Sequence, residues 1–235
     1  METLLQNMIF EQNFGYALFG NKPVSLAGYF LNPSLDAIFF NKKSFFFPVV
    51  EAWSMLEKNV LCHLQGNYIL LKQVNRVKND STFQAIIVNK SSFLQTVTDH
   101  LDLFCELLEE KIDPKELLDE VILNQKSLWD ILKGNRALYG IILGYGEKNS
   151  FAFEEEYRYF EEQHGSFDIQ TTPLSPVNLP DFTIMKDMDI ETKSLEKEYI
   201  KTLKNLIEIY AKGDFWSITL DRLIQKNASY VEQNS

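Results

Sequence analysis

The side chains that most often carry acid–base or nucleophilic chemistry are few in this chain and stand far apart. Histidine occurs at His63, His100 and His164, and the only thiols are Cys62 and Cys105. A thiol acts as a nucleophile when a base within hydrogen-bond reach removes its proton. Cys62 and His63 are adjacent, so a helix would point them to different sides, and the spacing of five aligns His100 and Cys105 poorly. The sequence therefore assigns no catalytic residue, and it favours small apolar packing roles for both thiols.

The densest group of metal-binding residue types is formed by Glu161, Glu162 and His164. In the helical His-Glu-x-x-His zinc motif, two histidines four residues apart point to the same side of the helix. This segment lacks that spacing, and a solvated helix end explains it better. We therefore expect neither a bound metal nor a cofactor.

Glycine recurs at Gly140, Gly144 and Gly146, a pattern that resembles nucleotide-binding loops. Position 149 is Asn149, so the Gly-x-Gly-x-x-Gly pattern is incomplete, and no Lys-Ser/Thr pair follows Gly146 as a P-loop requires. Because helix N-termini attract anions, an anion site after Gly146 is one interpretation. Close packing of two helices followed by a turn is the other, and the sequence favours it.

The most aromatic stretch covers residues 39–47 and contains Lys42 and Lys43. It predicts a β-hairpin with one aromatic face in the core and the two lysines solvated at the turn. A partner-binding patch or a membrane-surface wedge is the alternative interpretation.

Charge divides the chain near residue 105. Residues 1–105 carry 8 Lys/Arg and 8 Asp/Glu, whereas residues 106–235 carry 15 and 25, so the net charge of −10 belongs to the second part. Phosphate binding needs clustered basic residues, and the only evident cluster is Lys42-Lys43. We therefore expect no binding to nucleic acid, since an acidic surface repels phosphate and anionic lipid.

The chain has no readable signal peptide, and its longest near-apolar run, residues 137–145, is too short to span a bilayer. Two widely separated cysteines do not make a disulfide framework. We therefore expect a soluble, cytoplasmic protein in which Cys62 and Cys105 are not bonded to each other. Secretion by a signal-independent route, or with a trimmed signal, is the alternative.

Apolar periodicity predicts an α+β fold with a small antiparallel sheet. Strands are expected over residues 24–31, 68–74 and 82–88, and helices over residues 3–13, 48–64, 91–110, 114–124, 128–134, 137–143 and 150–163. The predicted organisation is a mixed body over 1–110, a helical region over 111–164, a long loop over 165–189 and a helical hairpin over 190–227.

The clearest apolar stripe follows helical spacing and consists of Leu195, Tyr199, Leu203, Leu206 and Tyr210. Gly213 and Asp214 then suit a helix end and the N-cap of a second helix. A two-helix hairpin cannot bury such a stripe alone. We therefore expect the hairpin to dock on its own body, with self-association as the alternative.

Two short segments, residues 14–23 (FGYALFGNKP) and 140–149 (GIILGYGEKN), are similar to segments of uncharacterised proteins of chlamydia-like intracellular bacteria. This resemblance implies no particular activity, cofactor or site residue. It implies a bacterial protein that is exposed to a host.

These observations favour a non-enzymatic protein-interaction module that binds a protein partner or a second copy through the hairpin or the long loop. The alternative is a hydrolase with a site assembled from scattered residues, such as Cys105 with His100 or His164 with a nearby glutamate.

Overall fold

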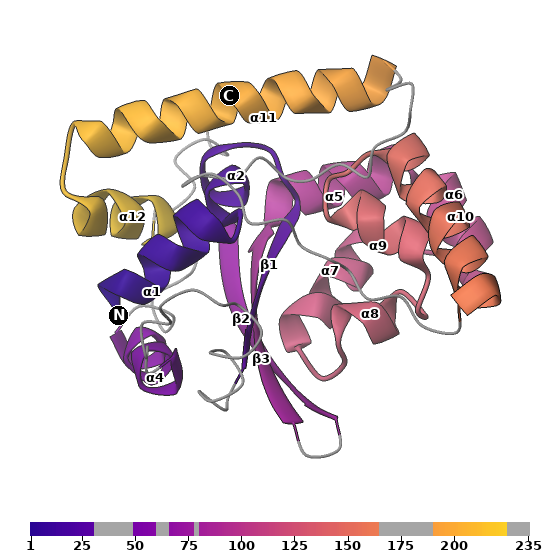
Figure 1. Ribbon diagram of the computed structural model, residues 1–235, viewed down its shortest axis with the longest axis horizontal. Coiled ribbons are helices and arrows are strands. Elements are labelled where there is room, and N and C mark those ends of the chain that lie inside the picture. The colour runs from indigo at the N-terminus through magenta and orange to yellow at the C-terminus, as the bar shows by residue number, and fades with distance from the viewer. Residues whose placement is uncertain (31–48, 60–65, 78–79, 165–189, 225–235) are drawn as a thin grey trace, which may run out of the picture.

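The computed structural model describes residues 1–30, 49–59, 66–77, 80–164 and 190–224 (Figure 1). The predicted aromatic hairpin at 39–47 and the predicted loop at 165–189 lie outside the described residues. So do Cys62, His63 and the last residues of the predicted hairpin region.

A three-stranded antiparallel sheet forms the middle layer, with β3 (Asp80–Asn89) between β1 (Val24–Phe30) and β2 (Tyr68–Val77). Successive side chains of a strand face opposite sides. Ala85 and Ile87 accordingly belong to one buried cluster, and Ile86 and Val88 to the other. The sheet is thus covered by helices on both faces, and the expected α+β class is confirmed (Figure 1).

The first helical layer packs on the face of Ala85 and Ile87. It consists of α1 (Glu2–Gln6), the π-helix η1 (Asn7–Glu11), α2 (Phe14–Phe19), α4 (Val49–Asn59) and α12 (Phe215–Ile224). The sequence did not predict α2, because Gly15 disfavours a helix. In the structure this glycine lies in close contact with α11, since a Cβ there would lie 2.7 Å from Leu206 Cδ1.

The second helical layer packs on the face of Ile86 and Val88. It consists of α5 (Lys90–Asp99), α6 (Leu101–Leu108), α7 (Pro114–Leu123), α8 (Leu128–Ile131) and α9 (Arg136–Ile142), and α10 (Glu147–His164) joins this layer by packing on α9. Asn89 and Asp113 cap α5 and α7 with their side chains. The predicted helical region over 111–164 therefore shares its core with the sheet.

The prediction of one helix from residue 91 to residue 110 is wrong. The backbone leaves the helical region at His100, with φ −113° and ψ 24°, and again at Glu109, with φ 54°. The break divides the segment into α5 and α6. Phe93 of α5 and Phe104 of α6 are nevertheless buried in the same cluster.

Helix α11 (Ile190–Ala211) runs across the ends of both helical layers (Figure 1). It packs on α2 of the first layer and on α10 of the second. Tyr199 and Leu206 of the predicted stripe are buried, and Asp214 accepts a hydrogen bond from Ser217 N at 2.8 Å to cap α12. The expectation that this segment docks on its own body is confirmed.

Among the described residues, no helix combines the length and the apolar composition that crossing a bilayer requires.

Candidate functional site

Cys105 and His100, the candidate nucleophile and base that the structure describes, do not form a nucleophile–base pair. Cys105 carries a free thiol, and its Sγ accepts a hydrogen bond from Ile112 N at 3.4 Å. The imidazole Nδ1 of His100 instead lies 3.1 Å from Oε2 of Glu147. The thiol thus has a packing position, and the histidine is oriented by a carboxylate.

His100 lines a groove of about 480 Å³ between α5, the turn after α9 and α11. Ser92, Thr96 and His100 succeed one another every four residues, so they share one face of the α5 segment. A helix rises 1.5 Å per residue, which places Ser92 roughly 12 Å along the axis from His100. No hydrogen bond joins His100 to a hydroxyl in the part of the chain that the structure describes.

The segment with Glu161, Glu162 and His164 forms the last turn of α10. Only its backbone is described, so the absence of a metal there stays a prediction. Within the described ranges, no three His, Cys, Asp or Glu residues are placed to hold a metal ion.

The recurring glycines build a tight corner between α9 and α10. A Cβ at Gly140 would lie 2.6 Å from Ser150 Oγ, so this glycine allows the two helices to approach closely. Gly144 and Gly146 have φ of +77° and +81°, which residues with a side chain rarely adopt. The interpretation as close packing followed by a turn is therefore confirmed.

The alternative interpretation, an anion site after Gly146, also fits the geometry. The anion there is a side-chain carboxylate of the same chain. Oε1 and Oε2 of Glu191 accept hydrogen bonds from Glu147 N at 3.0 Å and Lys148 N at 3.3 Å. A carboxylate at a helix N-terminus is stabilised by the unpaired N–H groups and the helix dipole. The first turn of α11 thus caps α10.

A second polar contact joins the corner to the middle of α11. The hydroxyl of Tyr199 donates a hydrogen bond of 2.6 Å to Gly144 O. Behind it, the fully buried Lys22 donates to Leu143 O, and its Nζ lies 4.6 Å from the centroid of the Tyr145 ring. Burial lowers the pKa of Lys22 to about 7. The carbonyl bond and the ring both favour the ammonium form at this helix end.

Contacts with the first helical layer complete the docking of the C-terminal helices. Thr202 and Leu206 of α11 fit against glycines of the N-terminal segment, and a Cβ at Gly20 would lie 2.8 Å from Thr202 Oγ1. From α12, Arg222 Nε donates to Leu18 O at 2.9 Å. These contacts fix which face of α11 is turned inward and which is turned outward.

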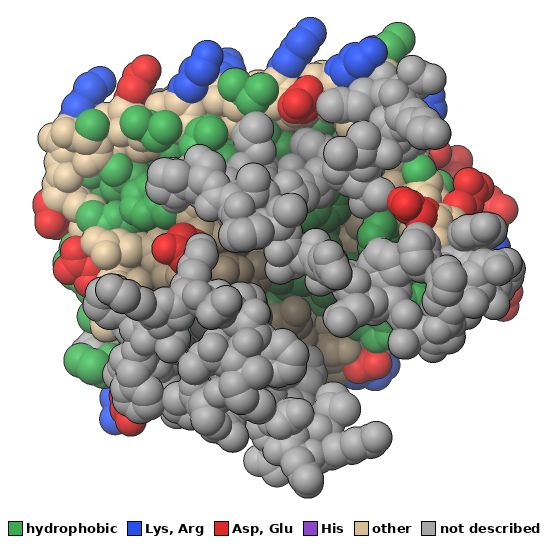
Figure 2. Space-filling view, in the orientation of Figure 1, with side chains coloured by type: hydrophobic (Ala, Val, Ile, Leu, Met, Phe, Trp, Pro, Cys, Tyr) green, Lys and Arg blue, Asp and Glu red, His purple; other side chains and the backbone are tan. Residues whose placement is uncertain are grey.

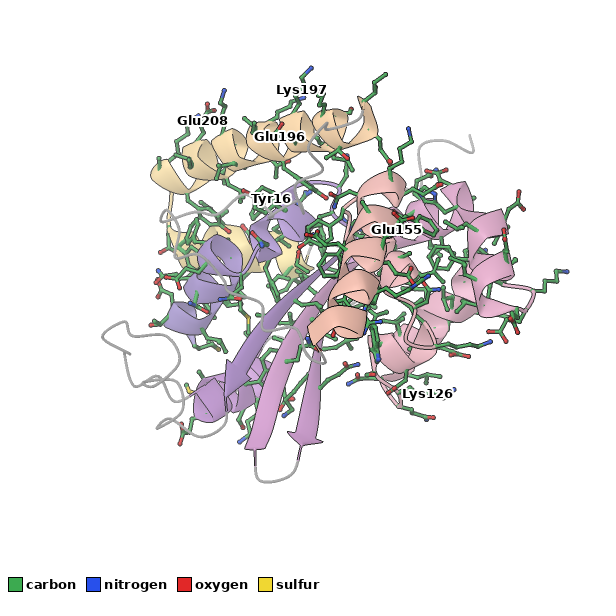
Figure 3. All side chains as sticks on the ribbon, turned by 45° about the vertical axis from the view of Figure 1, so that its right-hand side comes forward. Tyr16, Lys126, Glu155, Glu196, Lys197 and Glu208 are labelled. Atoms are coloured by element: carbon green, nitrogen blue, oxygen red, sulfur yellow. The ribbon has the colours of Figure 1, made fainter. Side chains whose placement is uncertain are left out.

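The outward face of α11 carries four exposed lysines, Lys193, Lys197, Lys201 and Lys204, which we call the lysine stripe. Their spacing of 4, 4 and 3 keeps them within about 80° around the helix axis and spreads them over about 16 Å. Figure 2 shows basic side chains along the edge of the molecule formed by α11, with acidic side chains between them. In Figure 3 the labelled Lys197 projects away from the body.

The four lysines form no ion pair with another described residue. The lysine stripe was not predicted, because its lysines are separated by two or three other residues in the sequence. The helical spacing from Lys193 to Lys204, opposite the apolar stripe, was the signal that would have revealed it.

No protein-family profile matches this chain, and no curated protein and no solved structure is significantly similar to it.

Proposed function

We propose that this chain is a non-enzymatic protein-interaction module that binds an acidic protein surface through the lysine stripe. The observation that carries the proposal is a row of exposed lysines on one helix, none in an ion pair with another described residue, in a protein whose net charge is −10. Such a local basic surface attracts and orients an acidic partner. The body supports this surface rigidly, because Glu191 and Tyr199 fix the inward face of α11.

The packing of α11 favours a protein partner over a lipid surface. A helix that binds at a membrane interface inserts its apolar face. Here Tyr199 and Leu206 of that face are buried against the body, with exposures of 2% and 1%. The exposed side chains of α11 include the lysines, the polar Ser194 and Asn205, the acidic Glu208 and scattered apolar side chains such as Ile207.

The binding test uses a synthetic helical peptide with glutamates at i, i+4 and i+7, titrated into the intact chain by fluorescence anisotropy. An exposed ion pair contributes about 0.2–1 kcal/mol, so binding is expected to be weak and to decrease as salt is added. The stripe variant is K197Q/K201Q/K204Q. The matched control is K111Q/K115Q/K126Q, which makes the same charge change on α7 and on the segments just before and after it.

We expect the stripe variant to lose roughly 3- to 100-fold in peptide affinity, as the loss of three exposed ion pairs implies, and the control variant to keep it. A duplex oligonucleotide of equal charge is the comparison ligand. If the duplex binds as tightly as the peptide, or if both variants lose affinity equally, the lysine stripe attracts any polyanion and the proposal is wrong. The host origin of a partner, which the bacterial resemblance implies, stays a prediction.

A hydrolase is the second candidate, and the pair of His100 and Glu147 in the groove is the observation that favours it. A carboxylate on Nδ1 leaves Nε2 of the imidazole to act as a base. Hydrolysis of activated esters that is abolished by both His100→Ala and Glu147→Gln, while circular dichroism is unchanged, would establish this function. Activity that is absent, or equal in the variants, would count against it.

A further inference from the structure

We propose that the lysine stripe binds the acidic face of α6 in a second copy of this chain, so that copies associate head to tail. This inference rests on the proposed function, because it names the partner of the same surface. The acidic face consists of Asp102, Glu106 and Glu109, all exposed on α6 and its C-terminal cap. We call it the acidic ridge.

The two surfaces have the same spacing. Asp102, Glu106 and Glu109 are separated by four and then three residues, as are Lys197, Lys201 and Lys204. Residues at this spacing lie on one side of a helix. When α11 of one copy lies beside α6 of another and runs in the same direction, each lysine faces one carboxylate.

Both surfaces are also available for pairing. The three carboxylates of the acidic ridge form no ion pair with another described residue, whereas the neighbouring Glu110 lies 3.2 Å from Lys133. The lysine stripe and the acidic ridge belong to different helices, so the contact joins unlike surfaces. Contacts between unlike surfaces either close into a ring or form an open chain, and an open chain keeps one unpaired surface at each end and can grow.

The test compares the oligomeric state of five proteins, the unmodified chain, two variants and their two controls, by sedimentation velocity at low and high salt. The ridge variant is D102N/E106Q/E109Q, and its matched control on α7 is E116Q/D119N/E120Q. The stripe variant and its control are those of the peptide experiment. Raising NaCl from about 25 mM to about 300 mM shortens the screening length from about 20 Å to about 6 Å.

We expect the unmodified chain to associate at low salt and to dissociate at high salt. The stripe variant alone and the ridge variant alone should remain monomeric, with association constants lower by roughly 1.5- to 5-fold for each lost pair. An equal mixture of the two variants should form a complex of two chains and grow no further. In that mixture one intact lysine stripe meets one intact acidic ridge, and no other complementary pair remains.

Three outcomes would overturn the inference: a monomeric unmodified chain at low salt, equal loss of association in the control variants, or a mixture that stays monomeric. If the chain is monomeric but still binds the glutamate peptide through the lysine stripe, the proposed function stands and only the second copy is wrong. Cosedimentation with phosphatidylserine vesicles that needs the lysine stripe, without self-association, would replace both proposals with a membrane surface.

Discussion

Replacing the buried Lys22 by methionine should remove a pH dependence from the free energy of unfolding. Burial lowers the pKa of Lys22 from 10.5 to about 7. Above pH 7 the folded protein therefore releases this proton, while the unfolded chain keeps it until about pH 10.5. Since the unfolded state then binds more protons, stability rises with pH in this window, by up to about 1.4 kcal/mol per pH unit for one group.

Between pH 7.5 and 9.5 the free energy of unfolding should rise by about 2 kcal/mol because of Lys22. The rise ends near pH 10 because burial raises the pKa of Tyr16 and Tyr210 to about 12. These two tyrosines keep their protons in the folded state and lose them in the unfolded state, so stability decreases above about pH 10.

Urea denaturation of the unmodified chain and of Lys22→Met at several pH values measures this effect. The variant should lose most of the rise in stability, whatever its absolute stability, because the loss of the donor to Leu143 O is independent of pH. Lys126→Met, at an exposed position, is the control and should keep the rise. Equal slopes in all three proteins would refute the reasoning and show that Lys22 stays protonated in the folded state.

Three further predictions concern the docking of α11 and the cap of α5, and each is measured by chemical denaturation. Tyr199→Phe should lower stability by about 1–3 kcal/mol because Gly144 O loses its buried donor, and no loss would mean that α11 does not dock there. Leu206→Ala, in a side chain 1% exposed, should cost about 2–5 kcal/mol, whereas Ile207→Ala, 54% exposed, should be nearly neutral. Asn89→Ala should cost at least about 1–2 kcal/mol, because the side chain caps α5 and also donates to Ala17 O; a neutral result would contradict the cap.

The sequence was sufficient to predict those elements that are determined by residues close to one another in the chain. Asp113 and Pro114 placed the start of α7, and the apolar stripe through Tyr199 and Leu206 showed which face of α11 is buried. N-caps, proline positions and apolar periodicity act over a few residues, so a single sequence displays them. The pairing of β2 with β3 was predictable for the same reason, since only a short turn separates them.

Features that depend on distant partners could not be predicted. Gly15 lies inside a helix because Leu206, far away in the sequence, needs the space. The break at His100 accompanies a contact with Glu147, and the anion at the start of α10 is the carboxylate of Glu191. The sequence displays the residue types in each case, but it does not display which of them meet.

The long reach of the C-terminal helices has a consequence for synthesis on the ribosome. Arg222 binds Leu18 O, and Glu198 binds Asn21, across separations of 204 and 177 residues. During translation, α2 and the adjoining part of the core lack these contacts until almost the whole sequence has been synthesised. Such non-local contacts slow folding and leave apolar surface exposed meanwhile. The nascent chain should therefore depend on chaperones until α12 has left the exit tunnel, and stop codons before α11 should yield aggregates rather than shortened folded proteins.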